Sequence, residues 1–263
     1  MRQESSHVTA VERAIDILEY IGTSVNSVTI NELSEKLGIP GSSCFRIVKN
    51  LTYRGYLSES SQMNGRYKLS FKILNLAEQV KLKLDIRSIA INHMRKIAQE
   101  TQHAVQLGVL QEDVVIYIEQ VLPNRVVNVI ASLQEPLSIN VSTAGKVLCA
   151  FLPLYQRIPF VQKSKFDNRT ENSIMDKEKF LEYLQQVNKE RFAIDLEEYS
   201  IGIGCLSMPI FDYQDQCIAS LGITGDIVDY QNEKKLSAMK SILHEACTEI
   251  SSRFGYKFEE NEG

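Results

Sequence analysis

Residues 31–51, NELSEKLGIPGSSCFRIVKNL, constrain the fold of this chain more than any other stretch. A helical pattern of apolar residues stops at Gly38, and a second begins directly after Ile39-Pro40-Gly41. Glycine readily adopts the left-handed conformation that closes a helix, and a proline just beyond prevents the helix from continuing. Two short helices joined by so tight a junction cross each other, so the stretch predicts a helix-turn-helix unit.

Two T-x-x-E pairs mark helix starts in this N-terminal region. Thr9 and Glu12 precede one apolar stripe at helical spacing, and Thr29 and Glu32 precede the next. In a capping box the threonine hydroxyl and the glutamate carboxylate each accept a backbone N–H of the first turn. Both pairs therefore predict capping boxes.

The third helix and a hairpin complete the small domain. Ser42 or Ser43 is expected to cap the third helix, and Asn64-Gly65 is a strong hairpin signal between two short strands. The inner face of this helix is predicted to consist of Cys44, Ile47, Val48 and Leu51. Three helices followed by a hairpin make a winged helix-turn-helix.

The outward face of the third helix is polar and basic. It carries hydroxyls, an amide and cations but no acid, and the segment 41–72 holds six Lys or Arg against one acid in a chain of formal net charge −4. A solvated helix face is the plain alternative. The tight turn, the acid-free face and the basic hairpin together favour DNA binding, with the helix in the major groove.

The residues expected to contact DNA are Ser42, Ser43, Phe45, Arg46, Lys49, Asn50, Arg66 and Lys68. Arg46 is predicted to bond a base, and Lys49 and Arg66 to contact phosphates. Phe45 is either a core aromatic or a contact to a thymine methyl, and Tyr53 is also a candidate core residue.

The remainder of the chain predicts an α+β domain with an antiparallel sheet flanked by helices. Strands are expected at 104–110, 114–121, 126–130, 137–141, 192–195, 207–212 and 217–224. Helices are expected at 87–100, 144–151, 176–190 and 232–254. The predicted organisation is a DNA-binding domain at 1–70, a linker helix at 71–84 and an effector-binding and oligomerisation domain at 85–263.

Composition excludes several classes of protein. No run approaches the roughly 20 apolar residues that span a bilayer, and the start MRQESSHVTA lacks a signal peptide's apolar stretch, so a cytoplasmic protein without a membrane partner is expected. The cysteines are odd in number and none stand as C-x-x-C, which argues against a disulfide framework or structural zinc. The histidines show no ligand spacing. No metal, cofactor or catalytic residue is predicted.

With these elements in place, the chain resembles the IclR family of bacterial transcriptional regulators along nearly its whole length. The segments VERAIDILEYI, INELSEKLGIPGSSCFRIVKNLTYRGYL and GRYKLSFKILNLA resemble that family's winged-helix domain. The segments LSINVSTAGKVLCAFLP and ERFAIDLEEYSIGIGCLSMPIFDYQDQCIASLGITGD resemble its effector-binding domain.

The resemblance implies a GAF-like sheet that binds a small effector, often a carboxylate or an aromatic or sugar acid, in a homodimer or homotetramer. It implies that double-stranded DNA is bound at an operator, with repression the commoner outcome. The effector pocket implied by the resemblance consists of Thr143, Ala144, Asp195, Cys205, Gly222 and Thr224.

Physical arguments bear on several of these residues. Backbone N–H groups at a helix start near Thr143 form an anion site. Asp195 and Cys205 converge if the loop 197–204 folds over the strand ends, although Asp195 also suits a cap or turn. Where the family often has a hydroxyl residue, this chain has Gly222, which predicts more room and a bulkier or partly apolar effector.

Two other functions are weighed against effector binding. Cys205 is a buried filler on the plain interpretation, but together with Cys217 it suggests a redox-sensing regulator. An enzyme that uses Cys205 as nucleophile lacks a recognisable orienting group, and the chain has no P-loop or G-x-G-x-x-G motif.

Overall fold

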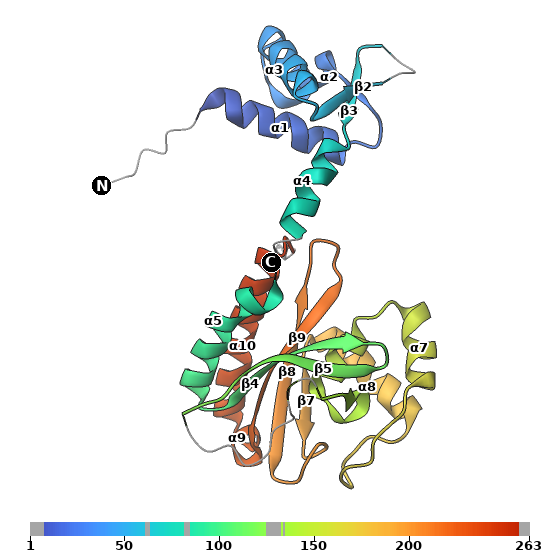
Figure 1. Cartoon of the computed structure of the whole chain (residues 1–263), viewed down its shortest axis with the longest axis vertical. Coiled ribbons are helices and arrows are strands. Elements are labelled where there is room, and N and C mark those ends of the chain that lie inside the picture. The colour runs from blue at the N-terminus through green and yellow to red at the C-terminus, as the bar shows by residue number, and fades with distance from the viewer. Residues whose placement is uncertain (1–7, 61–63, 82–84, 125–132, 134, 258–263) are drawn as a thin grey trace, which may run out of the picture. The chain divides into compact units, whose positions relative to one another are not determined.

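A computed structural model describes residues 8–60, 64–81, 85–124, 133 and 135–257, with only the backbone of 77–81. The chain divides into two compact units, Met1–Leu84 and Asp85–Gly263, whose elements are labelled in Figure 1. Within the described residues, no helix is long and apolar enough to cross a membrane.

The first unit is a helical domain with a small sheet. Its helices are α1 (Thr9–Thr23), α2 (Ile30–Leu37), α3 (Gly41–Tyr53) and α4 (Lys72–Lys81). Its strands β1 (Val28–Thr29), β2 (Leu57–Glu59) and β3 (Arg66–Leu69) form an antiparallel sheet in the order β1-β3-β2. The hairpin β2–β3 is the wing that follows the helix-turn-helix.

Local sequence explains the turn between α2 and α3. Thr29 Oγ1 accepts the Glu32 N–H at 3.2 Å, and the Glu32 carboxylate accepts the Thr29 N–H at 2.6 Å, so the predicted capping box forms. Gly38 ends α2 with φ +63°, the left-handed conformation expected of it. Cys44 and Val48 of α3 are fully buried against Ile17 and Leu33, which fixes how α3 is rotated about its axis.

Within its described residues, the second unit is a six-stranded antiparallel sheet with helices on both faces. The strand order is β6-β5-β4-β9-β8-β7. The strands are β4 (Ala104–Gln111), β5 (Val114–Val121), β6 (Leu137–Ser138), β7 (Ala193–Leu196), β8 (Ile203–Phe211) and β9 (Cys217–Asp226). The helices are α5 (Ile86–Thr101), α6 (Thr143–Ala150), α7 (Leu154–Lys163), α8 (Lys177–Glu190), α9 (Ile227–Gln231) and α10 (Glu233–Arg253).

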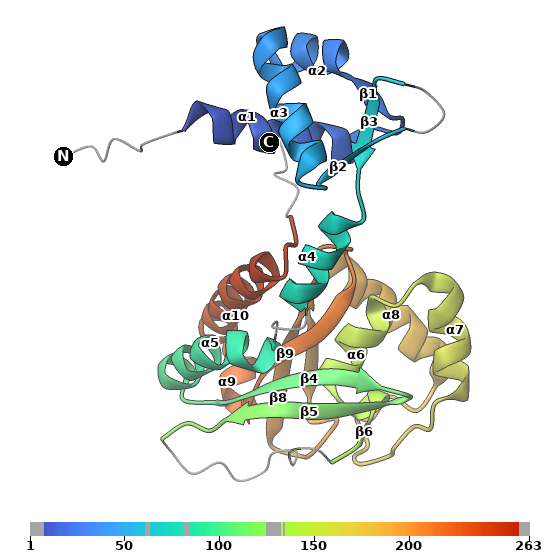
Figure 2. The ribbon, with the colours of Figure 1, turned by 45° about the horizontal axis from the view of Figure 1, so that its top comes forward.

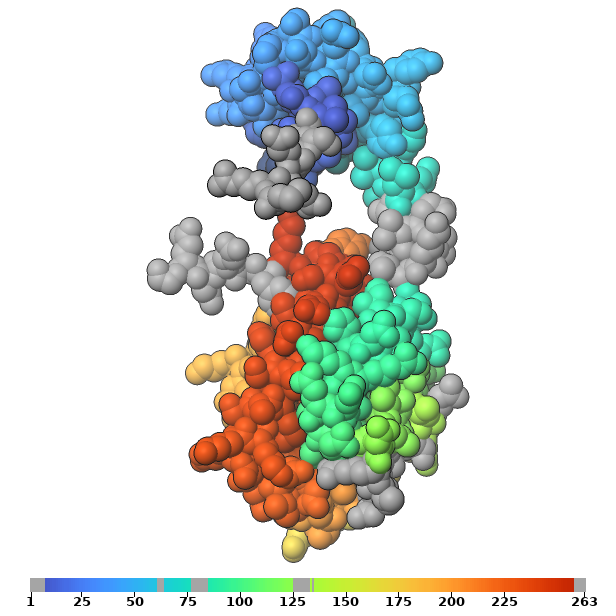
Figure 3. All heavy atoms as spheres, turned by 90° about the vertical axis from the view of Figure 1, so that its left-hand side faces the viewer, coloured from blue at the N-terminus to red at the C-terminus, as the bar shows by residue number. Residues whose placement is uncertain are grey.

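Alternation along the strands assigns one face to each group of helices. Leu206, Leu221 and Ile223 point to the face covered by α5 and α10, where the larger apolar core lies. Helices α6 and α8 cover the opposite face (Figure 2). Figure 3 shows α5 and α10 side by side on the surface of the unit. The α+β fold predicted from the sequence is confirmed.

Some local predictions are wrong. Helix α1 begins at Thr9 itself and its N-cap residue is Val8, so Thr9 does not occupy the N-cap position. Helix α3 begins at Gly41 after Pro40, again without a side-chain cap, so neither Ser42 nor Ser43 has the capping role. Proline fixes the backbone before the first turn, and the serines lie inside the helix.

Other elements differ in extent. The predicted strand 137–141 is a two-residue strand followed by a 3₁₀ turn, Ile139–Val141. Strand β8 begins four residues earlier than predicted, and α7 was not predicted because Pro159 interrupts its pattern. The predicted strand 126–130 lies outside the described residues, as does the end of the predicted linker helix, 82–84.

Candidate functional site

The outward face of α3 is exposed as the sequence pattern indicates. Ser42, Arg46, Lys49 and Asn50 are exposed, and Ser43 is half-buried. Phe45 is 49% exposed and Tyr53 is 90% exposed, so neither aromatic belongs to the core. Because α3 contains no acid, this face offers donors and cations to a partner with little competition from its own helix.

The four predicted cations differ in what they already bind. Among the described residues, the side chains of Arg46 and Lys68 have no hydrogen bond or ion pair. Lys49 Nζ lies 3.7 Å from Glu59 Oε2, and both side chains are exposed. Arg46 and Lys68 are therefore the cations available without breaking an internal contact.

Arg66 is held inside the domain. Its Nη1 donates to the Ser27 carbonyl at 2.6 Å, and its Nη2 lies 3.2 Å from Glu32 Oε1. The guanidinium thus braces β3 against the capping box of α2. In this arrangement it positions the wing, so the predicted phosphate contact would require these bonds to be exchanged.

A groove of about 540 Å³ runs between α1 and α3. Arg46 and Asn50 line it from α3, and Arg13 lines it from α1. Sequence reasoning missed Arg13 because it lies in the first helix, outside the helix-turn-helix stretch. Arg13, which is half-buried, is therefore a further cation beside the acid-free face of α3, in addition to Arg46 and Lys49.

The second candidate site is the sheet face under α6, here called the polar face. Strand register places Asp195, Cys205 and Thr224 side by side across β7, β8 and β9. One pleat along, Ser207 and Gly222 are partners, and Gly222 is paired in turn with Gln106 of β4. Thr143 and Ala144 reach the same face from α6, so the structure brings together all six residues expected in the pocket.

The start of α6 presents unused donors to the polar face. Ser142 caps the helix by accepting the Gly145 N–H at 3.3 Å. Among the described residues, no acceptor is recorded for the N–H groups of Thr143 and Ala144. Thr143 Oγ1 lies 2.7 Å from Ser207 Oγ. Free N–H groups at a helix start favour an anion.

Asp195 supplies an acceptor to the same face. It is 1% exposed, and its Oδ1 accepts the Glu198 N–H at 2.6 Å, so the turn-forming role considered for it is present. Within the described part of the chain its Oδ2 has no hydrogen-bond partner. Burial raises the pKa of Asp195, and the Lys146 cation opposes that rise. Asp195 Oδ1 therefore holds the turn, and Oδ2 is left to accept a hydrogen bond from a donor.

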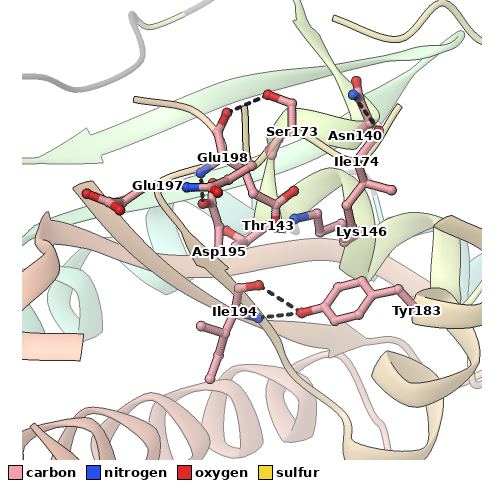
Figure 4. Close-up of polar contacts among 12 residues, drawn as sticks. Asn140, Thr143, Lys146, Ser173, Ile174, Tyr183, Ile194, Asp195, Glu197 and Glu198 are labelled. Atoms are coloured by element: carbon pink, nitrogen blue, oxygen red, sulfur yellow. Dashed lines mark hydrogen bonds and ion pairs between the residues drawn. The ribbon is translucent and has the colours of Figure 1, made fainter. Parts of the chain in front are cut away.

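Lys146 and Glu198 form a buried ion pair next to Asp195 (Figure 4). Lys146 is fully buried on α6, and Nζ also lies 5.3 Å from the Tyr183 ring centre. Ser173 Oγ donates to the Glu198 carbonyl at 2.9 Å, which holds the turn after β7. Burial raises the pKa of Glu198, while Lys146 lowers it. The lysine therefore binds a carboxylate inside the domain.

The geometry of the cysteines disfavours a disulfide switch. Cys205 is the register partner of Thr224, and Cys217 lies seven residues back along β9, roughly 23 Å at strand spacing. A disulfide requires Cα atoms within about 7 Å. Burial also raises the pKa of the Cys217 thiol to about 12 and that of Cys205 still further, so both thiols are protonated and weakly reactive at neutral pH.

The expectation that Gly222 leaves more room is wrong. A Cβ on Gly222 would overlap Ser207 Oγ and would lie 3.2 Å from the Leu206 carbonyl oxygen. The volume beside Gly222 is filled by the neighbouring serine. The structure therefore removes the basis for expecting a bulkier effector from this glycine.

Three residues of the polar face were missed by sequence reasoning: Gln106, Glu198 and Ser207. Ser207 stands two residues after Cys205 on one strand, so strand alternation alone places both on one face. No comparable signal marks Glu198, because its lysine partner is 52 residues away.

Comparison with known proteins covers both units. A family model described as the C-terminal domain of the bacterial transcriptional regulator IclR matches residues 79–252. A model of the IclR helix-turn-helix domain matches residues 10–61. The HTH-type transcriptional regulator XynR of Escherichia coli is 23% identical over 249 residues, which are 95% of this chain and 98% of XynR.

Solved structures share the fold over the same length. The Agrobacterium tumefaciens repressor BlcR has a TM-score of 0.78 at 22% identity, with 97% of this chain and 100% of BlcR covered. An IclR homologue from Microbacterium hydrocarbonoxydans, solved in complex with 4-hydroxybenzoate, has a TM-score of 0.60 at 20% identity, with 94% and 99% covered.

Proposed function

We propose that this chain represses transcription from a near-palindromic operator until an acid effector binds. It belongs to the IclR family, and is thus a DNA-binding transcriptional regulator and not an enzyme. Residues 1–70 would bind DNA, 71–84 would link, and 85–263 would bind the effector and oligomerise. A homodimer or a tetramer of two dimers would place two α3 helices on half-sites roughly 34 Å, or a multiple of that distance, apart.

The observation that carries the DNA-binding proposal is the exposed, acid-free face of α3. Arg46 is exposed with no partner among the described residues, so it can bond a guanine without first losing an internal contact. Lys49 and Lys68 are placed to neutralise phosphates. Affinity would then fall steeply as salt rises.

A DNA footprint tests this proposal. The purified full-length protein is incubated with its own upstream region and with neighbouring promoters at two salt concentrations. A protected near-palindrome whose occupancy falls steeply with salt supports the proposal. A folded protein that protects no sequence at either concentration contradicts it.

The effector proposal rests on two parts of the polar face, one of which offers hydrogen-bond donors and the other a hydrogen-bond acceptor. The Thr143 and Ala144 N–H groups at the start of α6 favour a carboxylate oxygen. Asp195 Oδ2 is a buried acceptor without a partner among the described residues, which favours a hydroxyl or other donor. An acid that also carries a hydroxyl satisfies both ends. The 4-hydroxybenzoate bound by the homologue has this chemistry.

Operator release is the matching experiment. The footprint is repeated with 4-hydroxybenzoate, with benzoate, which lacks the hydroxyl, and with glyoxylate as a small acid. Release by 4-hydroxybenzoate at lower concentration than by benzoate supports both ends of the pocket, and equal potency contradicts the role of Asp195. Release of the operator by glyoxylate at a lower concentration than by 4-hydroxybenzoate would indicate a small-acid effector.

The switch itself would be a population shift. The effector would favour a dimer arrangement in which the spacing of the two α3 helices no longer matches the half-sites of the operator. Residues 71–84 would transmit this change from the effector-binding domain to the DNA-binding domain. Coupling between two binding equilibria is reciprocal, so operator DNA must weaken effector binding by the same factor. Calorimetric titration of 4-hydroxybenzoate with and without operator measures that factor directly.

A further inference from the structure

We propose that Ser207 determines effector specificity by donating a hydrogen bond to the effector carboxylate from a position that only a glycine at 222 permits. The proposal rests on the acid-binding function above and assigns it a residue that the sequence did not point to. Its basis is the pairing of two positions on neighbouring strands.

Ser207 and Gly222 share one volume. They are register partners on β8 and β9 and face the same side of the sheet. A Cβ on Gly222 would overlap Ser207 Oγ, so a side chain at 222 and the present Ser207 conformer exclude each other. The present position of the Ser207 hydroxyl therefore depends on the glycine at 222.

The Ser207 hydroxyl lies against the start of α6. Ser207 is 2% exposed and Thr143 is 3% exposed, and their hydroxyl oxygens lie 2.7 Å apart. Two hydroxyls in one contact have two hydrogens, of which the contact uses one. Neither hydroxyl has another partner among the described residues, so when Thr143 donates to Ser207 in this contact, the Ser207 O–H remains to donate.

That donor joins the unused N–H groups of Thr143 and Ala144 at the start of α6. Leaving buried donors unsatisfied is unfavourable, and a carboxylate offers enough lone pairs to accept several of them. Asp195 lies on the neighbouring strand β7 beside Cys205, one pleat along β8 from Ser207. The site then orients an acid with its carboxylate between α6 and Ser207 and its hydroxyl toward Asp195.

Calorimetric titration of 4-hydroxybenzoate into the full-length protein tests the assignment with four variants. Ser207→Ala removes the hydroxyl, Gly222→Ser adds a competing one, and the double variant Ser207→Ala/Gly222→Ser moves the hydroxyl from β8 to β9. Ser220→Ala is the matched control, because Ser220 is a buried serine on the same face whose hydroxyl already donates to the Met208 carbonyl at 3.3 Å.

A hydrogen bond to a charged group corresponds to a change of roughly tenfold to a hundredfold in affinity. We expect Ser207→Ala to lower the affinity for 4-hydroxybenzoate by that factor, and Ser220→Ala to lower it by less than about threefold. Gly222→Ser should bind poorly and melt at lower temperature, while the double variant should recover both melting temperature and affinity. A structural role alone would move the melting temperature but leave the affinity unchanged.

The outcomes separate this inference from the acid-binding function. Wild-type affinity in Ser207→Ala, with 4-hydroxybenzoate still bound by the wild type, overturns the role of Ser207 and leaves the acid effector standing. No binding of 4-hydroxybenzoate or glyoxylate by a wild type that protects its operator contradicts the acid class and this role together.

Discussion

Removal of the buried Lys146 cation is the sharpest test of how the polar face is held together. Lys146 is fully buried, and its ion-pair partner is Glu198, which is 8% exposed. Asp195 brings a second carboxyl group to the same cluster. Lys146→Met keeps a side chain of similar length but leaves two buried carboxyl groups without a cation.

The expected loss follows from that arrangement. Breaking a buried ion pair from one side leaves an uncompensated charge, which lowers the free energy of unfolding by about 3–5 kcal/mol. The double variant Lys146→Met/Glu198→Met also removes the paired carboxylate, so only Asp195 is left without a cation, and it should recover part of this loss. Lys96→Met is the control, since Lys96 pairs with Glu245 at 3.5 Å on the surface, where such a pair contributes less than about 1 kcal/mol.

The loss should depend on pH. Burial raises the pKa values of Asp195 and Glu198, and Lys146 opposes the rise in both. Without the lysine both pKa values rise further, so the folded variant holds these protons more tightly than the unfolded chain does. The stability that they contribute is fully present below the unfolded pKa values of about 4 and is lost as pH rises through the folded values. The deficit relative to wild type should therefore shrink from pH 7 to pH 5.

Urea unfolding at both pH values measures these quantities. Because the chain has no tryptophan, unfolding is followed by circular dichroism. A loss at pH 7 no larger than that of Lys96→Met, or a loss that grows toward pH 5, would refute the reasoning.

Three further predictions concern individual residues. Thr29→Ala should lower the stability of the first unit by about 1 kcal/mol in urea unfolding, because its hydroxyl caps α2; an unchanged midpoint would argue against the cap. Gly145→Ala should cost about 1–3 kcal/mol in the same assay, since a Cβ there would lie 2.6 Å from the Ile139 carbonyl oxygen, and a stability equal to that of wild type would show that the backbone yields. Cys205 should react with iodoacetamide at pH 8 far more slowly in the folded protein than in urea, because burial raises its thiol pKa; rapid labelling followed by mass spectrometry would reopen the redox interpretation.

The sequence predicted those features that depend on neighbouring residues. The Thr29–Glu32 capping box and the Gly38 terminus are set within a few residues, and both formed as expected. The buried face of α3 followed from apolar spacing. The expected caps at Thr9 and Ser42 failed because the preceding backbone, at Val8 and Pro40, decides where each helix begins.

Features that depend on distant residues escaped prediction. The Lys146–Glu198 pair joins α6 to the turn after β7, and no local pattern relates two such positions. The space beside Gly222 is decided by a serine on the neighbouring strand, which only the strand register reveals. The bracing of Arg66 likewise involves Ser27 and Glu32, far away in sequence.

The central claim is that the outward face of α3 reads the operator. Fluorescence anisotropy of the wild type, Arg46→Ala and Lys68→Ala on the footprinted operator and on a scrambled duplex, at two salt concentrations, tests it most directly. Arg46→Ala should weaken operator binding by about 1–3 kcal/mol and leave scrambled DNA nearly unchanged, while Lys68→Ala should weaken both alike and reduce the salt dependence. Operator affinity unaffected by Arg46→Ala would contradict the claim.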